Sequence, residues 1–274
     1  MPDPIEPFLS LPPDPTPLRS SRLQLVGGGS NILVVPDSLD PTSSWLPVAE
    51  ALVHYRVWLL DRSDPHDHEI RTIDALADTV ARAVVSLGGR PAVLGHGTGA
   101  VALLQALIAQ PDLPVGRAIL CEPLIPVAGR LFDRLLPEIR AAIERRDLAE
   151  AIRLYFDHVA PVSRQSADRM TAMSSLQALV PALVPELAQV DRLAWTTADA
   201  ARVTVPVLLL VGERSAGYPA GAASAALADA MPDAQTQVVP KLRHYAHPHE
   251  ASRIADRIAK FLAEPADTSD AAAA

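Results

Sequence analysis

The sequence predicts an α/β fold, with a mostly parallel, doubly wound sheet and a helical insertion between two of its strands. Short, almost continuously apolar segments alternate with segments of helical periodicity along the 274 residues, and one long interval has helical segments only. Nearly continuous apolar runs are typical of strands buried on both faces of a parallel sheet. Hydrophobic residues make up 49% of the chain, which is enough for a substantial core.

The expected strands are six short apolar runs, with one more at an edge of the sheet. They cover residues 31–36, 56–61, 91–95, 117–122, 206–212 and 236–240, and the edge strand covers residues 22–27. Helices are expected between strands at residues 43–55, 72–88 and 98–110. The second helix has apolar residues at three- and four-residue spacing, and Gly88 is a typical terminator. This alternation favours a doubly wound sheet.

The interval between Glu122 and Val205 contains no clear strand. Residues 130–160 are strongly helical by period, and residues 166–190 are expected to form weaker helices broken by prolines. We interpret the insertion as a lid over the carboxyl edge of the sheet, where ligands of open α/β sheets bind. The expected organisation is a proline-rich arm at 1–20, a core at 21–123 and 201–264, a lid at 124–200 and a disordered tail at 265–274.

Composition and charge narrow the class of protein. The formal net charge of -8 argues against a nucleic-acid partner, which needs clustered basic residues. Cys121 is the only cysteine, so no intramolecular disulfide can form. The first residues lack the pattern of a signal peptide, and no apolar stretch is long enough to span a membrane. We therefore expect a cytoplasmic protein with a small-molecule substrate and neither a nucleic-acid nor a membrane partner, and leave open a homodimer.

The most informative stretch is the run of alternating glycines at residues 95–99, between an expected strand and an expected helix. Many hydrolases place a nucleophilic serine at the centre of such a G-x-S-x-G turn, but here the centre is Gly97. His96 and Thr98 flank it, and the backbone N–H of Thr98, at a helix N-terminus, is expected to form half of an oxyanion hole. The hydroxyl of Thr98 is better explained by local hydrogen bonding than by a substitute nucleophile.

Together these elements resemble the α/β-hydrolase superfamily over roughly residues 22–263. The resemblance rests on the strand–glycine–helix unit, the helical insertion after the following strand, "VLLLVGE" and the late histidine in "VPKLRHYAH". Small hydrolases with the motifs "GHSxGA" and "LYEPP" are the most similar, and this chain has "GHGTGA" and "LCEPL" at the same places. The resemblance implies a helical lid over the sheet.

The resemblance also implies roles for individual residues. His244 is at the position of the general base, although His247 and His249 compete for that assignment. The usual catalytic aspartate is replaced by Ser215, so Glu122 at the end of a strand and Glu213 are the alternatives, with Glu122 slightly favoured. A histidine without a carboxylate partner is a less well oriented base.

The loop after the first core strand departs from the family. Relatives carry His-Gly there, where this chain has Pro36, Asp37 and Ser38. Asp37 places negative charge where an oxyanion is normally stabilised, so it is interpreted as a base or as a group that orients a polar substrate. The alternative is an ordinary turn, for which Pro-Asp-Ser is suited.

Aromatic residues and histidines supply the remaining candidates. Trp195 and Tyr155 in the insertion, with Tyr245, are expected to bind substrate, although packing of helices explains aromatic residues equally well. The stretch "HYAHPH" suggests a metal site, but no matching cluster of ligands is apparent in the sequence. Neither a metal nor another cofactor is therefore expected.

Three functions are compatible with these residues. The first is an enzyme that acts on a small, largely apolar metabolite without a serine nucleophile, by acid/base chemistry such as elimination, cyclisation, isomerisation or direct attack of water. The second is an ester or thioester hydrolase that carries an inactivating serine-to-glycine change at position 97. The third is a non-catalytic binding protein on a hydrolase scaffold.

Overall fold

The computed structural model describes residues 23–63, 72–127, 129–159, 170, 173–193 and 195–264. The predicted arm at 1–20 and the predicted tail at 265–274 lie outside these residues. No helix in these ranges is both long enough and apolar enough to cross a membrane.

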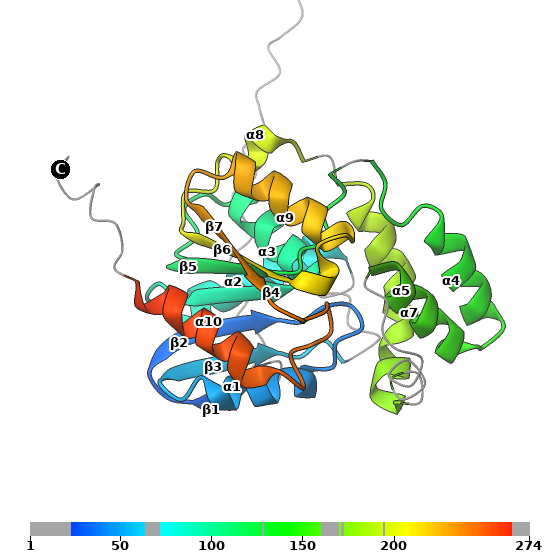
Figure 1. Cartoon of the computed structure of the whole chain (residues 1–274), viewed down its shortest axis with the longest axis horizontal. Coiled ribbons are helices and arrows are strands. Elements are labelled where there is room, and N and C mark those ends of the chain that lie inside the picture. Colours follow the sequence, from blue (N-terminus) through cyan, green and yellow to red (C-terminus); the bar gives the residue numbers. More distant parts are fainter. Residues whose placement is uncertain are drawn as a thin grey trace, which may run out of the picture.

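The seven predicted strands form one sheet in the order β1-β3-β2-β4-β5-β6-β7 (Figure 1). Their bounds are β1 Leu23–Gly27, β2 Ser30–Val35, β3 Tyr55–Leu60, β4 Ala92–His96, β5 Arg117–Cys121, β6 Val207–Gly212 and β7 Ala234–Val239. All neighbours are parallel except β1, which pairs antiparallel with β3. The predicted doubly wound, mostly parallel sheet is confirmed.

Helices cover both faces of the sheet, as continuous apolar strands require. On one face, α1 (Leu46–Ala51) and α10 (Ala251–Ala263) pack together over a core that includes Trp45 and Phe261. The opposite face carries α2 (Ile73–Leu87), α3 (Thr98–Ala109), the short α8 (Thr197–Ala200) and α9 (Pro219–Ala230). Two short 3-10 turns, η2 (Thr42–Trp45) and η4 (Glu213–Ser215), follow β2 and β6.

Local sequence explains the ends of α2. The Thr72 side chain accepts a hydrogen bond from the backbone N–H of Ala75, which caps the N-terminus. Gly88 then adopts a φ of 68° at the other end, a conformation that suits glycine. The helix therefore begins and ends within one residue of its predicted bounds.

The helix predicted at 43–55 is shorter than expected. Residues 42–45 form η2, α1 ends at Ala51, and Tyr55 already belongs to β3, where it is paired with Ser30. The apolar residues at the end of the predicted helix are needed by the sheet, and this tertiary pairing overrides the helical periodicity.

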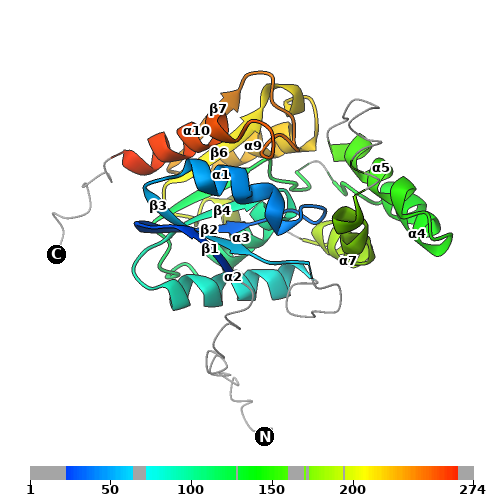
Figure 2. The same cartoon turned by 90° about the horizontal axis from the view of Figure 1, so that it is seen from below.

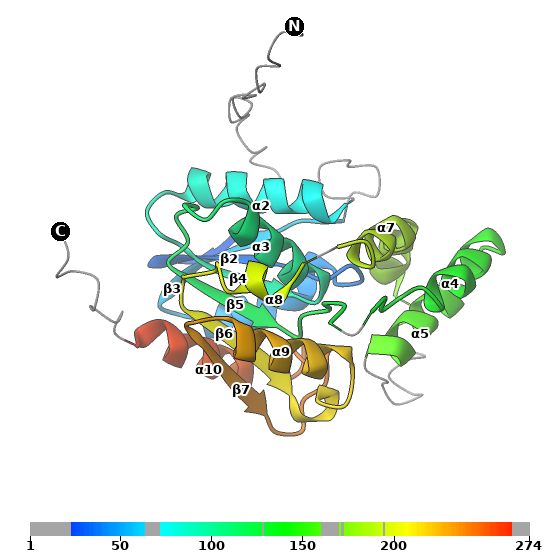
Figure 3. The ribbon, with the colours of Figure 1, turned by 90° about the horizontal axis from the view of Figure 1, so that it is seen from above.

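In the part of the chain that the structure describes, the interval between β5 and β6 contains α4 (Leu135–Glu144), α5 (Leu148–Val159) and α7 (Ser174–Val190), the inserted helices, followed by the short α8. Figures 2 and 3 view the molecule from opposite sides, and in both the inserted helices lie beyond one end of the strands. The prediction that prolines break residues 166–190 was wrong for α7, which continues through Pro181 and Pro185. Burial of Leu179, Leu183 and Leu187 offsets the backbone hydrogen bonds that the prolines remove.

Candidate active site

The backbone makes a tight bend at Gly97, between β4 and α3. Gly97 has φ 53° and ψ -115°, a region that L-residues rarely adopt. Two residues later, a Cβ on Gly99 would collide with the backbone of Val35, so a glycine is needed where α3 passes close to the end of β2. Gly97 is therefore at the carboxyl end of the central strand, as the glycine pattern predicted.

Asp37 occupies the space next to Gly97. A Cβ built on Gly97 would lie within 2.8 Å of all three carboxyl atoms of Asp37, Cγ, Oδ1 and Oδ2, closer than real side chains approach. The backbone N–H of Thr98 donates to Asp37 Oδ1 over 2.7 Å, and the Thr98 hydroxyl donates to the same oxygen over 3.0 Å. The expectation that the Thr98 N–H is available to an oxyanion therefore needs correction, because the chain's own carboxylate accepts it.

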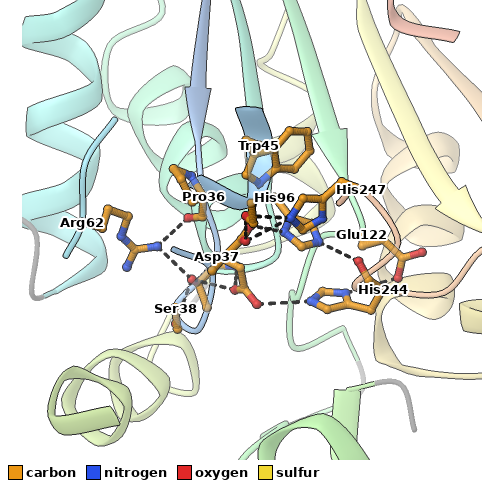
Figure 4. A network of polar contacts seen from close by, with 12 residues as sticks. Pro36, Asp37, Ser38, Trp45, Arg62, His96, Glu122, His244 and His247 are labelled. Carbon is orange, nitrogen blue, oxygen red and sulfur yellow. Dashed lines mark hydrogen bonds and ion pairs between the residues drawn. The ribbon is translucent and has the colours of Figure 1, made fainter. Parts of the chain in front are cut away.

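The other oxygen of Asp37 faces the inserted helices and the late histidine (Figure 4). The hydroxyl of Tyr155, on α5, donates to Asp37 Oδ2 over 2.6 Å, and His244 Nε2 lies 3.2 Å from the same atom. Ser38 Oγ lies 2.9 Å from Thr98 Oγ1, the hydroxyl that donates to Asp37 Oδ1. Asp37 is thus buried among hydrogen-bond donors from three separate segments.

Glu122 is the carboxylate beside His244. Its Oε2 lies 3.3 Å from His244 Nδ1, and its Oε1 accepts the backbone N–H of Gly212 over 2.6 Å. Glu122 has a φ of 50°, which is strained for a residue with a side chain and directs the carboxylate from the end of β5 toward β6. Glu213, the alternative acid, instead accepts the backbone N–H of Lys241. Ser215 is buried and its Oγ has no partner among the described residues.

Charge pairing determines the protonation of this group. Burial by itself lowers the pKa of His244, but the hydrogen bonds and negative charges of Asp37 and Glu122 outweigh burial and raise it to about 10. Burial by itself raises the pKa of Asp37, but the hydrogen bond and charge of His244, with smaller contributions from His96 and the Thr98 N–H, hold it well below its usual value. His244 is therefore an imidazolium beside Asp37 and Glu122 at neutral pH, and of the two roles expected for it, acid or base, this state is suited to the acid.

Burial, followed by the charge and hydrogen bond of Asp37, raises the pKa of Tyr155 well above its usual value. Tyr155 therefore stays a neutral phenol and remains a donor to Asp37.

The other aromatic candidates, Trp195 and Tyr245, do not contact Asp37, His244 or Glu122 through a hydrogen bond that the described residues show. Trp195 Nε1 donates to Gln105 Oε1 over 2.6 Å, and its ring packs against the core. The ring of Tyr245 contacts those of Phe156 and His247. Of the three residues expected to bind substrate, only Tyr155 therefore contacts the candidate site.

Space at the site is small. The cavity that borders Glu122, His244 and His247 has a volume of about 20 Å³, enough for a single water molecule. Larger cavities of about 510 Å³ and about 470 Å³ lie between α4 and α7, lined by residues that include Arg140, Ala188 and Arg192. On the other side of His244, Asp37 occupies the space over Gly97, and the Tyr155 hydroxyl donates to its carboxylate.

Three polar residues near the site, Asp40, Arg62 and Glu186, were missed in the sequence. Asp40 and His247 form a second buried cluster with His96, and Arg62 forms a buried ion pair with Glu186 on α7. Arg62 also donates to the carbonyl of Pro36, beside Asp37. The only signal for Asp40 was its place three residues after Asp37 in the loop after β2, and nothing in the sequence pairs position 62 with position 186.

Comparisons with known proteins agree on the fold. A family model described as "Alpha/beta hydrolase family" matches residues 27–257. No curated protein matches the chain. An alpha/beta hydrolase from Sphaerobacter thermophilus is 21% identical with a TM-score of 0.72, the match covering 88% of this chain and 95% of that one.

Two further solved structures are similar at the same level. A bromoperoxidase from Bacillus anthracis is 14% identical with a TM-score of 0.70, covering 88% of this chain and 95% of that one. A thermophilic esterase from Thermogutta terrifontis is 18% identical with a TM-score of 0.70, covering 88% and 92%. At these identities the likeness concerns the fold alone.

Proposed function

The chain belongs to the alpha/beta hydrolase family, and we propose that within this family it is an enzyme that works by proton transfer, without an acyl-enzyme intermediate. The observation that carries the proposal is the place of Asp37. Its carboxylate lies where a nucleophilic side chain at position 97 would lie, and it is the group that faces His244 Nε2.

The arrangement argues against ester hydrolysis through a serine. Position 97 has no side chain, and the N–H of Thr98, which would stabilise an oxyanion, is bound to a carboxylate. His244 is held as an imidazolium, which cannot take a proton from a nucleophile. A hydrolase altered at position 97 alone would not need a carboxylate in that space, so this alternative is disfavoured.

Asp37 and His244 are suited to acid/base chemistry. Burial raises the pKa of Asp37 and lowers that of His244. The largest contribution that opposes burial in each residue is the hydrogen bond between them, to which Glu122 adds for His244, and His96 and the Thr98 N–H add for Asp37. A substrate that enters between them removes the contact but keeps the burial. Asp37 then becomes a stronger base and His244 a stronger acid, which are the two groups that an elimination or isomerisation needs.

The surroundings favour a small, largely apolar substrate. Tyr155 and Phe156 on α5 are buried next to the site, and the charged groups of the site are already paired with one another. Since Tyr155 covers Asp37, substrate entry requires α5 to move away from the sheet. The inserted helices would then act as the lid that the sequence predicted.

The test is exchange of carbon-bound protons in D₂O, followed by NMR with a panel of neutral, largely apolar ketones and lactones. We expect exchange with the wild-type protein, a large loss in Asp37→Asn and His244→Gln, and no loss in the matched control Glu213→Gln. p-Nitrophenyl acetate should give no burst with the wild type. Exchange no faster than with heat-denatured protein across the panel, or a clear acyl-enzyme burst, would contradict the proposal.

One observation favours a second candidate, a non-catalytic binding protein. The space over Gly97 is occupied by the Asp37 carboxylate, which already accepts hydrogen bonds from the Thr98 N–H and the Tyr155 hydroxyl. For this candidate we expect His244→Gln to leave every activity and every ligand affinity unchanged. Loss of turnover in that variant would exclude it.

A further inference from the structure

A second buried polar cluster lies directly behind the first and is formed by Asp40, His96 and His247. His96 Nδ1 lies 3.0 Å from Asp40 Oδ2, and His247 Nε2 lies 3.0 Å from Asp40 Oδ1. One ligand atom from each residue lies within 4.8 Å of the others. The three residues are at most 2% exposed.

The cluster joins three segments that are far apart in the sequence. Asp40 is in the loop after β2, His96 ends β4, and His247 is in the loop before α10. Trp45 supports them: its Nε1 donates to Asp40 Oδ2 over 2.5 Å, and its ring stacks on His247 at 4.3 Å between centroids. The Ser44 hydroxyl lies 2.9 Å from His247 Nε2 and donates to Asp40.

His96 has an acceptor at each of its ring nitrogens. Nε2 lies 3.0 Å from the carbonyl oxygen of His244, so it must carry a proton in order to bond. Nδ1 faces the carboxylate of Asp40, which is also an acceptor. A metal cation placed between His96 Nδ1 and the Asp40 carboxylate would be held by both of these electron-pair donors.

We propose that Asp40, His96 Nδ1 and His247 Nε2 bind a divalent transition-metal ion, with zinc as the first candidate. Two imidazoles and a carboxylate are a donor set that zinc uses, with metal–ligand bonds of about 2.0–2.2 Å and ligand atoms about 3.3 Å apart at the corners of a tetrahedron. His96 Nδ1 lies 3.0 Å from Asp40 Oδ2 and His247 Nε2 lies 3.0 Å from Asp40 Oδ1, and one ligand atom from each residue lies within 4.8 Å of the others, so the side chains must shift to reach this spacing. The contact of His96 Nε2 with a backbone carbonyl is the partner that orients a metal-binding histidine.

The neighbouring set of Asp37, His96 and His244 is a poorer candidate. Both ring nitrogens of His244 already face carboxylates, Asp37 on one side and Glu122 on the other. His96 meets His244 through its backbone carbonyl and by ring stacking, with centroids 4.6 Å apart. The ion is therefore assigned to Asp40, His96 and His247.

The site revises the expectation that the stretch "HYAHPH" has no partner ligands. Those ligands are supplied by Asp40 and His96, which only the folded chain brings to His247. An ion bound there would cross-link the three segments that carry Asp37, Gly97 and His244. Its main effect would therefore be to make the candidate active site more rigid. Because the ligands are buried, the ion is expected to enter during folding and to exchange slowly.

The experiment measures metal content, with no activity involved. The protein is expressed with zinc in the medium, purified without a polyhistidine tag, dialysed against EDTA and analysed by mass spectrometry for metals. We expect about one zinc ion per chain in the wild type and at least about tenfold less in His247→Gln. The matched control is His249→Gln, an exposed histidine two residues away, which should retain the metal.

A second variant keeps the test decisive if His247→Gln folds poorly. His247→Cys retains a metal ligand, so after growth with cobalt it should show a thiolate-to-cobalt charge-transfer band that the wild type lacks. Circular dichroism of each variant reports folding separately. Wild-type protein without stoichiometric metal, or equal metal in the wild type and a folded His247→Gln variant, would overturn the proposal.

Discussion

Asp37 and a side chain at position 97 exclude one another. A Cβ on Gly97 would lie within 2.8 Å of the carboxyl carbon and both carboxyl oxygens of Asp37, and Gly97 has a φ of 53°. The missing nucleophile and the unusual aspartate are therefore one structural feature. Neither position can be understood, or changed, without the other.

The first prediction follows from this exclusion. Gly97→Ser alone should lower the free energy of unfolding by about 1–3 kcal/mol, because the new side chain overpacks a filled space. It should give no gain in hydrolysis of p-nitrophenyl acetate. The double change Asp37→Ala with Gly97→Ser removes the clash and frees the Thr98 N–H and His244 Nε2, so we expect a measurable acylation burst in stopped-flow kinetics.

Asp37→Ala alone is the matched control, since it opens the same space without a nucleophile. It should show no burst. If Gly97→Ser alone hydrolysed the ester as well as the double variant does, the two positions would not be coupled and this interpretation would be wrong.

The second prediction concerns pH. The pKa of His244 rises from 6.5 to about 10 in the folded protein, so its contribution to stability is fully present below pH 6.5 and is lost as the pH rises through about 10. The pKa of Asp37 is lowered in the folded protein. The contribution of Asp37 to stability is therefore fully present above pH 3.8, its ordinary pKa, and is lost as the pH falls through its lower pKa in the folded protein. Urea unfolding should therefore show stability decreasing steadily from neutral pH toward pH 10.

The variant His244→Gln should flatten this alkaline decrease, and His249→Gln should leave it unchanged. Equal slopes in the wild type and His244→Gln would mean that another group titrates and that the imidazolium does not stabilise the fold.

The third prediction concerns Tyr155. Tyr155→Phe removes a buried hydrogen bond to a charged oxygen, and bonds of this kind contribute about 1.5–3 kcal/mol. We expect a loss of stability of that size in urea denaturation near neutral pH. The matched control is Tyr218→Phe, whose hydroxyl has no hydrogen-bond partner among the described residues. Equal losses in the two variants would mean that the bond to Asp37 contributes nothing measurable.

The sequence was sufficient for the features that depend on local pattern. Continuous apolar runs predicted the central strands β2, β4, β5 and β6, because a strand buried on both faces leaves that pattern without help from distant residues. The glycines at 95–99 predicted the bend, because backbone geometry alone demands them. His244 and Glu122 were also named from the sequence, through the resemblance to the α/β-hydrolase superfamily.

Features that depend on contacts between loops were not predictable. No pattern relates Asp37 to the empty space at Gly97, or Asp40 to His247, because these pairs meet only when separate loops converge. The prolines of α7 show the same limit. Their local cost was recognised, but the burial that offsets it belongs to the packed structure.

The fourth prediction concerns the ion pair between Arg62, after β3, and Glu186 on α7. The two side chains are 6% and 1% exposed, and Arg62 Nε and Glu186 Oε2 have no hydrogen-bond partner among the described residues. Removing one partner leaves a buried unpaired charge, so Arg62→Met or Glu186→Met should each lower stability by about 3–5 kcal/mol. Arg62→Met with Glu186→Met leaves no charge behind, so its cost should be clearly smaller than the sum of the single losses.

A double-mutant cycle by urea denaturation measures this coupling, with the helical pair Arg153 and Glu150 as the comparison. These side chains are 46% and 30% exposed, and pairs of that kind contribute at most about 1 kcal/mol. Strong coupling at Arg62 and Glu186 but weak coupling at Arg153 and Glu150 is the expected result, because solvent screens only the second pair. Additive losses at Arg62 and Glu186 would mean that α7 is held to the sheet by apolar packing alone, and that the ion pair beside Pro36 and Thr98 does not fix the position of the inserted helices over Asp37.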